Sequence, residues 1–311
     1  MYKRQDARDA NILMVSDHGF GPIHRFFSMN IWLMEHGYLH LKNDPVSAFK
    51  RAWFSLGFTP VLFYRLSMAL GLARHRLAGG FHSRQRMQML LNRFFLSLEN
   101  VDWSKTLAYS RGNYGQIYIN LKGREPSGCV NPGSEYDRIR ENIRHELLET
   151  RDPLTGDQLF DRVYFREEIY EGPYVDEAPD IVYLPKDMKN KALGTLDFTS
   201  NRFVFPVHGN SGDHRMEGIL LGIGDAFRQG HNFGSLSILD VAPTVMHLLG
   251  LGVPRQMDGK VAAGILSEDF MSQNPVRYTD NQLLGHAKGS ALSREASDDI
   301  RRRLEGIGYV G

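Results

Sequence analysis

The chain of 311 residues carries 37 Lys and Arg against 36 Asp and Glu, so its formal net charge is +1 with His neutral. This balance lacks the bulk basic excess of proteins that bind nucleic acid backbones, and no specific nucleic acid binding is expected. Hydrophobic residues make up 42% of the chain and charged residues 23%, which is typical of a globular protein with ample material for a core. The single cysteine, Cys129, excludes an intrachain disulfide and any Cys-based metal site, and we expect it to be a small buried hydrophobe.

The first predicted element is a buried strand over residues 12–15, ILMV, bounded by the polar sequence SDHG. A short uninterrupted apolar run of this kind is typical of a strand buried on both faces. A helix is predicted next over residues 29–35, ending at Gly37.

The segment 46–100 has a different composition. Apolar residues recur in it at helical spacing, among them Phe49, Ala52, Trp53 and Leu56, which predicts three amphipathic helices separated near Pro60 and near residues 79–80. This segment contains eight Lys and Arg residues and one acidic residue. Its net charge is therefore +7, which leaves −6 for the remainder of the chain. The near-neutral total therefore conceals a strongly polarised charge distribution.

Strands and helices alternate in the rest of the chain. Predicted strands cover residues 116–121, 181–184 and 218–223, and predicted helices cover residues 134–148 and a segment that begins at Asp240 and ends before Gly250. Asp240 is favoured as the N-cap of the last helix because Pro243 is tolerated only in a first turn. This alternation predicts an α/β fold with a largely parallel central sheet flanked by helices.

Asp17 and His18 are the first candidate site residues. They follow the strand at residues 12–15, and active sites of open α/β sheets gather at the carboxyl ends of strands. Gly19 permits a turn that lets both side chains converge on one point. A carboxylate and an imidazole together suit Zn²⁺, or Mn²⁺ if more oxygen ligands join. The alternative is a loop histidine bonded to a carboxylate.

His214 is the second candidate, in the sequence GDHR just before the apolar run at residues 218–223. It follows His18 by 196 residues, so only tertiary folding brings the two together. His208 is a nearby competitor for the same role. Taken singly, either histidine is better explained as a hydrogen-bonded loop residue.

Three segments taken in order carry a family resemblance. VSDHGFGPI, GDHRMEGILLGIG and SILDVAPTVMHLLGLGVPRQMDGK closely resemble the type I phosphodiesterase/nucleotide pyrophosphatase branch of the alkaline phosphatase superfamily. NLKGREPSGCVNPG and APDIVYLP resemble uncharacterised phosphohydrolases within it. The resemblance extends over residues 11–260 and implies an alkaline-phosphatase-like core.

The resemblance implies a phosphate ester hydrolase with two divalent metal ions, Zn²⁺ or alternatively Mn²⁺. Asp17 and His18 match the pair that binds the metal holding a Ser or Thr nucleophile, and His214 matches a ligand of the second metal. The family's nucleophile, its first Asp ligand and a D-x-x-x-H ligand pair are expected upstream of Asp17. No D-x-x-x-H pattern is found, because Val204 and Asn210 stand four residues before His208 and His214. We therefore expect an N-terminally truncated, inactive chain with three of six ligands.

The predicted organisation has four parts: core residues 6–45, a basic helical cap at residues 46–100, further core at residues 101–266, and a C-terminal tail at residues 267–311. The cap is interpreted as a packed subdomain with a solvated Arg face. The alternatives are a lid that attracts an anionic nucleotide or lipid-phosphate substrate, and a contact with an anionic membrane surface.

The leading functional prediction is hydrolysis of small phosphate mono- or diesters. The alternatives are a metal-dependent phosphomutase of the same superfamily and a non-catalytic module that binds a membrane or a partner. No signal or membrane-spanning segment is visible, which slightly favours the cytoplasm. The sequence predicts neither the substrate nor the oligomeric state.

Overall fold

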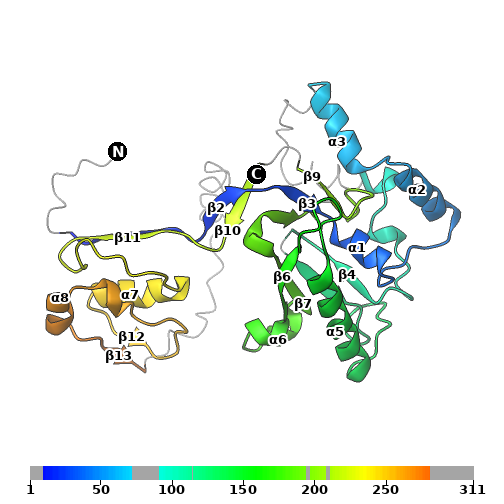
Figure 1. Cartoon of the computed structure of the whole chain (residues 1–311). Helices are drawn as coiled ribbons and strands as arrows, with labels where there is room; N and C mark the ends of the chain where they lie inside the picture. The colour runs from blue at the N-terminus through cyan, green and yellow to red at the C-terminus, as the bar shows by residue number, and fades with distance from the viewer. Residues whose placement is uncertain (1–9, 72–90, 114, 194–196, 208–210, 281–311) are drawn as a thin grey trace, which may run out of the picture. The chain divides into compact units, whose positions relative to one another are not determined.

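The computed structural model describes residues 10–71, 91–113, 115–193, 197–207 and 211–280. The chain divides into two compact units (Figure 1). Unit 1 combines Met1–Gly19 with Met216–Gly311, and unit 2 is Phe20–Arg215. The four parts predicted from the sequence are a different division of the chain, and their boundaries remain predictions.

A four-stranded antiparallel sheet forms the centre of unit 2. In spatial order its strands are β4 (Ala108–Ser110), β5 (Gln116–Ile119), β7 (Ile181–Pro185) and β6 (Phe160–Phe165). Helix α5 (Ser134–Glu149) packs against β6 (Figure 1) and buries Ile139, Ile143 and Leu147, which share one helix face because they are four residues apart. The predictions of these two central strands and of this helix are confirmed.

Asp180, directly before β7, ties this sheet to α5 from inside the core. Its carboxylate is fully buried and accepts hydrogen bonds from Arg124 Nη1 and Nη2 at 2.8 and 2.6 Å, and from Tyr136 Oη at 2.5 Å. The backbone N–H of Ile119 donates to the same carboxylate at 2.6 Å. A buried carboxylate is tolerated only when it is paired and hydrogen-bonded in this way.

Smaller elements complete unit 2. Strand β3 (Arg25–Phe27) lies between β8 (Asn190–Ala192), its parallel neighbour, and β9 (Val204–Pro206), its antiparallel neighbour. Strand β2 (Gly19–Pro22) pairs with β10 (Gly212–Arg215). The helices are α1 (Met29–Glu35), α2 (Pro45–Ser55), α3 (Pro60–Ala69) and α6 (Arg166–Ile169), and short 3₁₀ turns cover Leu98–Asn100, Val175–Glu177 and Lys186–Met188.

The helix predicted at residues 29–35 is confirmed, and Gly37 follows it with φ +77°, a conformation that favours glycine. Of the three helices predicted in residues 46–100, α2 and α3 are confirmed. The third falls largely on residues 72–90, outside the described part of the chain, and residues 91–94 are helical. Cys129 is half-buried and its thiol donates to the carbonyl of Thr106 at 3.1 Å.

Unit 1 has a separate core around α7 (Val241–Leu248). Its buried residues are Phe227, Val253, Val261, Ala262, Ile265 and Leu266. The other elements are β1 (Ile12–Val15), β11 (Leu220–Ile223), β12 (Val253–Pro254), β13 (Tyr278–Thr279), α8 (Glu268–Gln273) and 3₁₀ turns at Ile238–Asp240 and Ala263–Ile265. Asp240 is the N-cap residue of α7 as predicted, although its carboxylate accepts from the backbone N–H of Lys260, at 2.9 Å.

Strand β1 is not buried, contrary to the sequence prediction, and the apolar strand β11 is largely exposed as well. Among the residues that the structure describes, β1 and β11 pair only with each other, as an antiparallel two-stranded ribbon. Leu13 and Leu220 contact the unit 1 core, whereas Ile12, Met14, Leu221 and Ile223 are exposed. The unit 1 core therefore covers only one face of the β1–β11 ribbon, although the composition of both strands is apolar.

The mixed α/β class is confirmed, and the central, largely parallel sheet remains a prediction. Strand pairs among the described residues are mostly antiparallel, and the largest sheet has four strands. The two described parallel pairs are β3 with β8 and β12 with β13. Within the described ranges, every helix is too short or too polar to cross a membrane.

Candidate functional site

Asp17 and His18 occupy a bend between β1 and β2, where the sequence analysis places them. His18 Nε2 lies 3.6 Å from Asp17 Oδ1, so the two side chains converge. The Asp17 side chain is largely exposed, and that of His18 is about one third exposed. His18 Nδ1 lies 2.7 Å from the carbonyl oxygen of Gly19. Because a carbonyl only accepts, Nδ1 carries the proton, and in the neutral ring Nε2 has the lone pair.

Ser16, the residue before this pair, has a structural role. Its hydroxyl oxygen accepts a hydrogen bond from the backbone N–H of Ile219 at 2.8 Å, and its own N–H donates to the Ile219 carbonyl at 3.0 Å. Gly218 leaves room for this contact, since a Cβ there would lie 2.5 Å from the Ser16 hydroxyl oxygen. Ser16 thereby fixes the end of β1 beside the start of β11.

His214 lies on β10 in unit 2, and its imidazole is held by a carboxylate. His214 Nδ1 lies 2.7 Å from Asp213 Oδ1, and the Lys191 ammonium forms an ion pair with Asp213 Oδ2. Burial by itself raises the pKa of Asp213, but the hydrogen bonds from Lys191 and His214 lower it to about 2. The ionised carboxylate only accepts, so the proton of the neutral His214 ring sits on Nδ1.

Arg215 fixes the strand that carries His214. Its guanidinium donates from Nη1 to the carbonyl of Met188 at 2.6 Å and from Nη2 to the carbonyl of Pro22. Gly21 leaves room for this side chain, since a Cβ there would lie 2.6 Å from Arg215 Nε. Met188 and the preceding Asp187 both have φ of 53°, which non-glycine residues adopt only where the surrounding contacts hold them.

The structure brings Asp17 and His18 together within unit 1, and it places His214 in unit 2. His208 lies outside the described residues. Over the described ranges, no group of three or more His, Cys, Asp or Glu side chains is arranged to hold a metal ion.

The donor atoms of Asp17 and His18 suit a divalent metal ion. Zinc binds imidazole nitrogen at about 2.0–2.1 Å and carboxylate oxygen at about 2.0–2.2 Å, so two ligand atoms of one ion lie no more than about 4.3 Å apart. The 3.6 Å between His18 Nε2 and Asp17 Oδ1 satisfies this limit. Nδ1 of both His18 and His214 lies within hydrogen-bond distance of an oxygen atom. In known metal sites, a hydrogen bond at the ring nitrogen that does not bind the metal orients the imidazole in this way.

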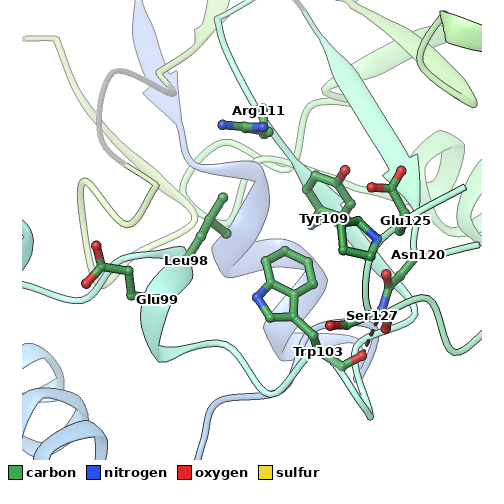
Figure 2. A pocket seen from close by; sticks show the side chains of 9 residues that line it. Leu98, Glu99, Trp103, Tyr109, Arg111, Asn120, Glu125 and Ser127 are labelled. Atoms are coloured by element: carbon green, nitrogen blue, oxygen red, sulfur yellow. Dashed lines mark hydrogen bonds between the residues drawn. The ribbon is translucent and has the colours of Figure 1, made fainter.

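A pocket in unit 2 was not predicted from the sequence. Its volume is about 390 Å³, and its lining residues are Leu98, Glu99, Trp103, Tyr109, Arg111, Asn120, Glu125, Pro126 and Ser127. The Trp103 and Tyr109 rings meet edge to face with centroids 5.1 Å apart. Figure 2 shows the Tyr109 hydroxyl near the Glu125 carboxylate. Burial and this carboxylate raise the pKa of Tyr109 to about 12.

This pocket offers aromatic rings beside charged groups of both signs, which suits an organic molecule with a polar end. Asn120, Glu125 and Ser127 come from the polar loop after β5, a segment that the sequence analysis noted only for its family resemblance. A polar, Gly- and Pro-containing loop that follows a buried strand is the signal that points to such residues. Asp17, His18 and His214 do not line this pocket.

Comparison with known proteins gives one family assignment. The sequence profile of the type I phosphodiesterase / nucleotide pyrophosphatase family matches residues 2–190. The match contains Asp17 and His18 and the loop after β5, whereas His214 lies beyond it. No curated protein and no solved structure matches the chain. Because the profile covers more than half of its residues, this chain belongs to the type I phosphodiesterase/nucleotide pyrophosphatase family.

Proposed function

We propose that this protein has the chemistry of a phosphoesterase for small phosphodiesters or pyrophosphates, such as nucleotides, with the help of two divalent metal ions, although a chain with three of the six expected ligands is predicted to be inactive by itself. The family consists of phosphoric ester hydrolases and generally uses divalent metals. The observation that supports the proposal is the convergence of Asp17 and His18, inside the family match, to a spacing that one metal ion bridges. Zn²⁺ is the proposed ion and Mn²⁺ the alternative, because the donors are an imidazole and a carboxylate.

Each proposed ligand has a defined task. Asp17 supplies a carboxylate oxygen and His18 supplies Nε2 to one ion, while His214 supplies Nε2 toward the second. When bound, divalent cations polarise the phosphoryl oxygens and lower the pKa of a coordinated hydroxyl or water. The carbonyl of Gly19 and the carboxylate of Asp213 keep the proton on Nδ1 of the respective rings, so that Nε2 presents its lone pair.

Metal analysis of the purified chain of 311 residues tests the ligand assignment. After dialysis against Zn²⁺ or Mn²⁺ and removal of free ion, we expect bound metal in the unaltered protein. Asp17→Ala, His18→Ala and His214→Ala each remove a donor, so each variant is expected to retain less metal. His145→Ala is the matched control, because His145 is an exposed histidine on α5 that is not a proposed ligand.

Activity is measured separately on a chromogenic phosphodiester, with release of the ester alcohol as the readout. Metal retention that is unchanged in His214→Ala would show that His214 is not a ligand. Metal loading without hydrolysis would agree with the inactivity predicted for a chain with three of six ligands. Release of the ester alcohol would support the proposed reaction and contradict the predicted inactivity.

A further inference from the structure

Helix α2 turns its largest apolar side chains outward. The residues that it buries are Ser47, Lys50 and Phe54. The Lys50 ammonium donates to the carbonyl of Asn92 at 2.7 Å, and Phe54 meets Phe198 edge to face at 6.3 Å. The inward contacts of α2 are therefore made by one aromatic residue and two polar ones, which reverses the usual amphipathic pattern of a surface helix.

The outward side chains form a continuous apolar stripe, defined here as Val46, Phe49, Trp53, Leu56 and Phe58. The first four are spaced three or four residues apart and so share one face of the helix. The Phe49 and Trp53 rings stack with centroids 5.9 Å apart, and Trp53 stacks on Phe58 at 3.9 Å. Phe49 is 66% exposed and Leu56 is 75% exposed. The sequence predicts an amphipathic helix here, and in the structure the apolar stripe is exposed.

Helix α3 adds a second exposed apolar surface. Pro60 is its single buried residue, whereas Phe63, Leu66 and Met68 are exposed, as is Leu70 at its C-cap. Figure 1 shows α2 and α3 at the edge of unit 2, away from the four-stranded sheet. A helix with so many apolar residues is normally buried in a core or in lipid. Exposed apolar surface of this extent marks an interaction site.

The charge of the same segment identifies the class of partner. Residues 46–100 carry a net charge of +7, and Arg51 and Arg65 on the two helices are exposed. Exposed aromatic and aliphatic side chains interleaved with arginines are typical of helices that lie in the interface of an anionic membrane. We propose that α2 and α3 dock on an anionic phospholipid surface, with the apolar stripe inserted among the acyl chains and Arg51 and Arg65 at the headgroups.

A second copy of this chain is the competing occupant, because the spacing of the stripe also suits helix pairing. Charge argues against it: two copies would bring two segments of +7 together, whereas anionic lipid neutralises each of them. The proposal does not depend on the metal site or on the reaction proposed above.

Vesicle co-sedimentation of the chain of 311 residues tests the proposal. We expect the protein to pellet with vesicles of phosphatidylcholine and phosphatidylserine but much less with phosphatidylcholine alone. Binding should weaken between about 0.1 M and about 1 M salt, since the arginine contacts are screened. A blue shift of tryptophan fluorescence on adding vesicles is expected from the insertion of Trp53.

Two variants separate the apolar from the electrostatic contribution. Phe49→Ser/Trp53→Ser removes two inserted rings and is expected to weaken vesicle binding by about tenfold or more. Arg51→Glu/Arg65→Glu leaves the stripe intact and should abolish the preference for phosphatidylserine. Leu154→Ser is the control, because Leu154 is an exposed leucine of unit 2 that lies outside α2 and α3. Circular dichroism verifies that each variant folds.

Three outcomes would overturn the proposal. The first is no binding of the unaltered protein to anionic vesicles at low salt. The second is equal loss of binding in the Leu154→Ser control and in the stripe variant. The third combines two measurements: size-exclusion chromatography with light scattering shows a dimer that Phe49→Ser/Trp53→Ser converts to a monomer, and the same variant binds vesicles as well as the unaltered protein. The stripe would then pair two copies of the chain.

Discussion

At the scale of single residues, the imidazoles of the candidate site are held by their Nδ1 atoms. His18 is fixed by a backbone carbonyl next to it in the sequence, and His214 by the adjacent Asp213. Asp213 is itself held by Lys191, which comes from β8. A local sequence pattern therefore defines the first contact of each histidine, and tertiary folding adds the lysine that keeps Asp213 ionised.

The lowered pKa of Asp213 predicts a dependence of stability on pH. Its folded-state pKa of about 2 lies below the ordinary value of 3.8, so the ionised form stabilises the fold above about pH 4, and this stabilisation is lost as the pH falls toward 2. Asp213→Asn removes the charge at every pH. The difference in unfolding free energy between the unaltered protein and Asp213→Asn should therefore be larger at pH 6 than near pH 2.

Urea denaturation at the two pH values measures this difference. The contributions of the other carboxylates to the unfolding free energy cancel, because both proteins contain them. Asp161→Asn, at an exposed position on β6, serves as the control and should show no such change. A pH-independent difference for Asp213→Asn would contradict the prediction.

At the scale of elements, α5 and the four-stranded sheet are joined by apolar packing and by one buried polar network. Ile139, Ile143 and Leu147 supply the apolar contact. Asp180 supplies the polar one, because it binds Arg124 in the loop after β5, Tyr136 on α5 and the backbone of β5 at once. This network also fixes the loop that carries Glu125 and Ser127 into the pocket of unit 2.

Asp180→Ala is expected to destabilise the protein by about 3–5 kcal/mol, because it leaves the Arg124 charge without its buried partner. The free energy of unfolding in urea, followed by circular dichroism, measures the loss. Asp161→Ala removes an exposed carboxylate from the same sheet and should cost little. Equal effects of the two substitutions would refute the role assigned to Asp180.

At the scale of the whole molecule, the chain crosses between units twice and builds a separate core in each. The unit 1 core is formed by residues that follow β11, whereas the unit 2 core draws on residues between Ile23 and Phe205. No residue belongs to both cores among those that the structure describes. Each unit therefore has its own source of apolar stabilisation.

Substitutions in the two cores should consequently affect separate unfolding transitions. Leu266→Ala in unit 1 and Ile143→Ala in unit 2 each remove a fully buried side chain, at an expected cost of about 2–5 kcal/mol to the unit concerned. Differential scanning calorimetry should show one transition shifted by Leu266→Ala and another by Ile143→Ala. A single transition moved equally by both substitutions would show that the units unfold together.

The sequence predicted the elements with the clearest local signals. Helix α5 follows from a strict spacing of apolar residues, α7 from the position of Pro243, and the Asp17–His18 pair from its place after an apolar strand. The family resemblance follows from three motifs taken in order, one of which contains Asp17 and His18, and the profile match over residues 2–190 confirms the family.

Tertiary structure decided which apolar residues are covered. ILMV in β1 and the apolar stripe of α2 both have compositions typical of buried elements. Among the described residues, however, β1 pairs with β11 alone, and α2 buries Ser47, Lys50 and Phe54. Tertiary structure also pairs Lys191 with Asp213, which lies 22 residues later in the sequence. It likewise brings Trp103 and Glu125, from separate loops, to the lining of one pocket. Periodicity determines which residues share a face, but the direction of that face depends on long-range packing, which local sequence does not encode.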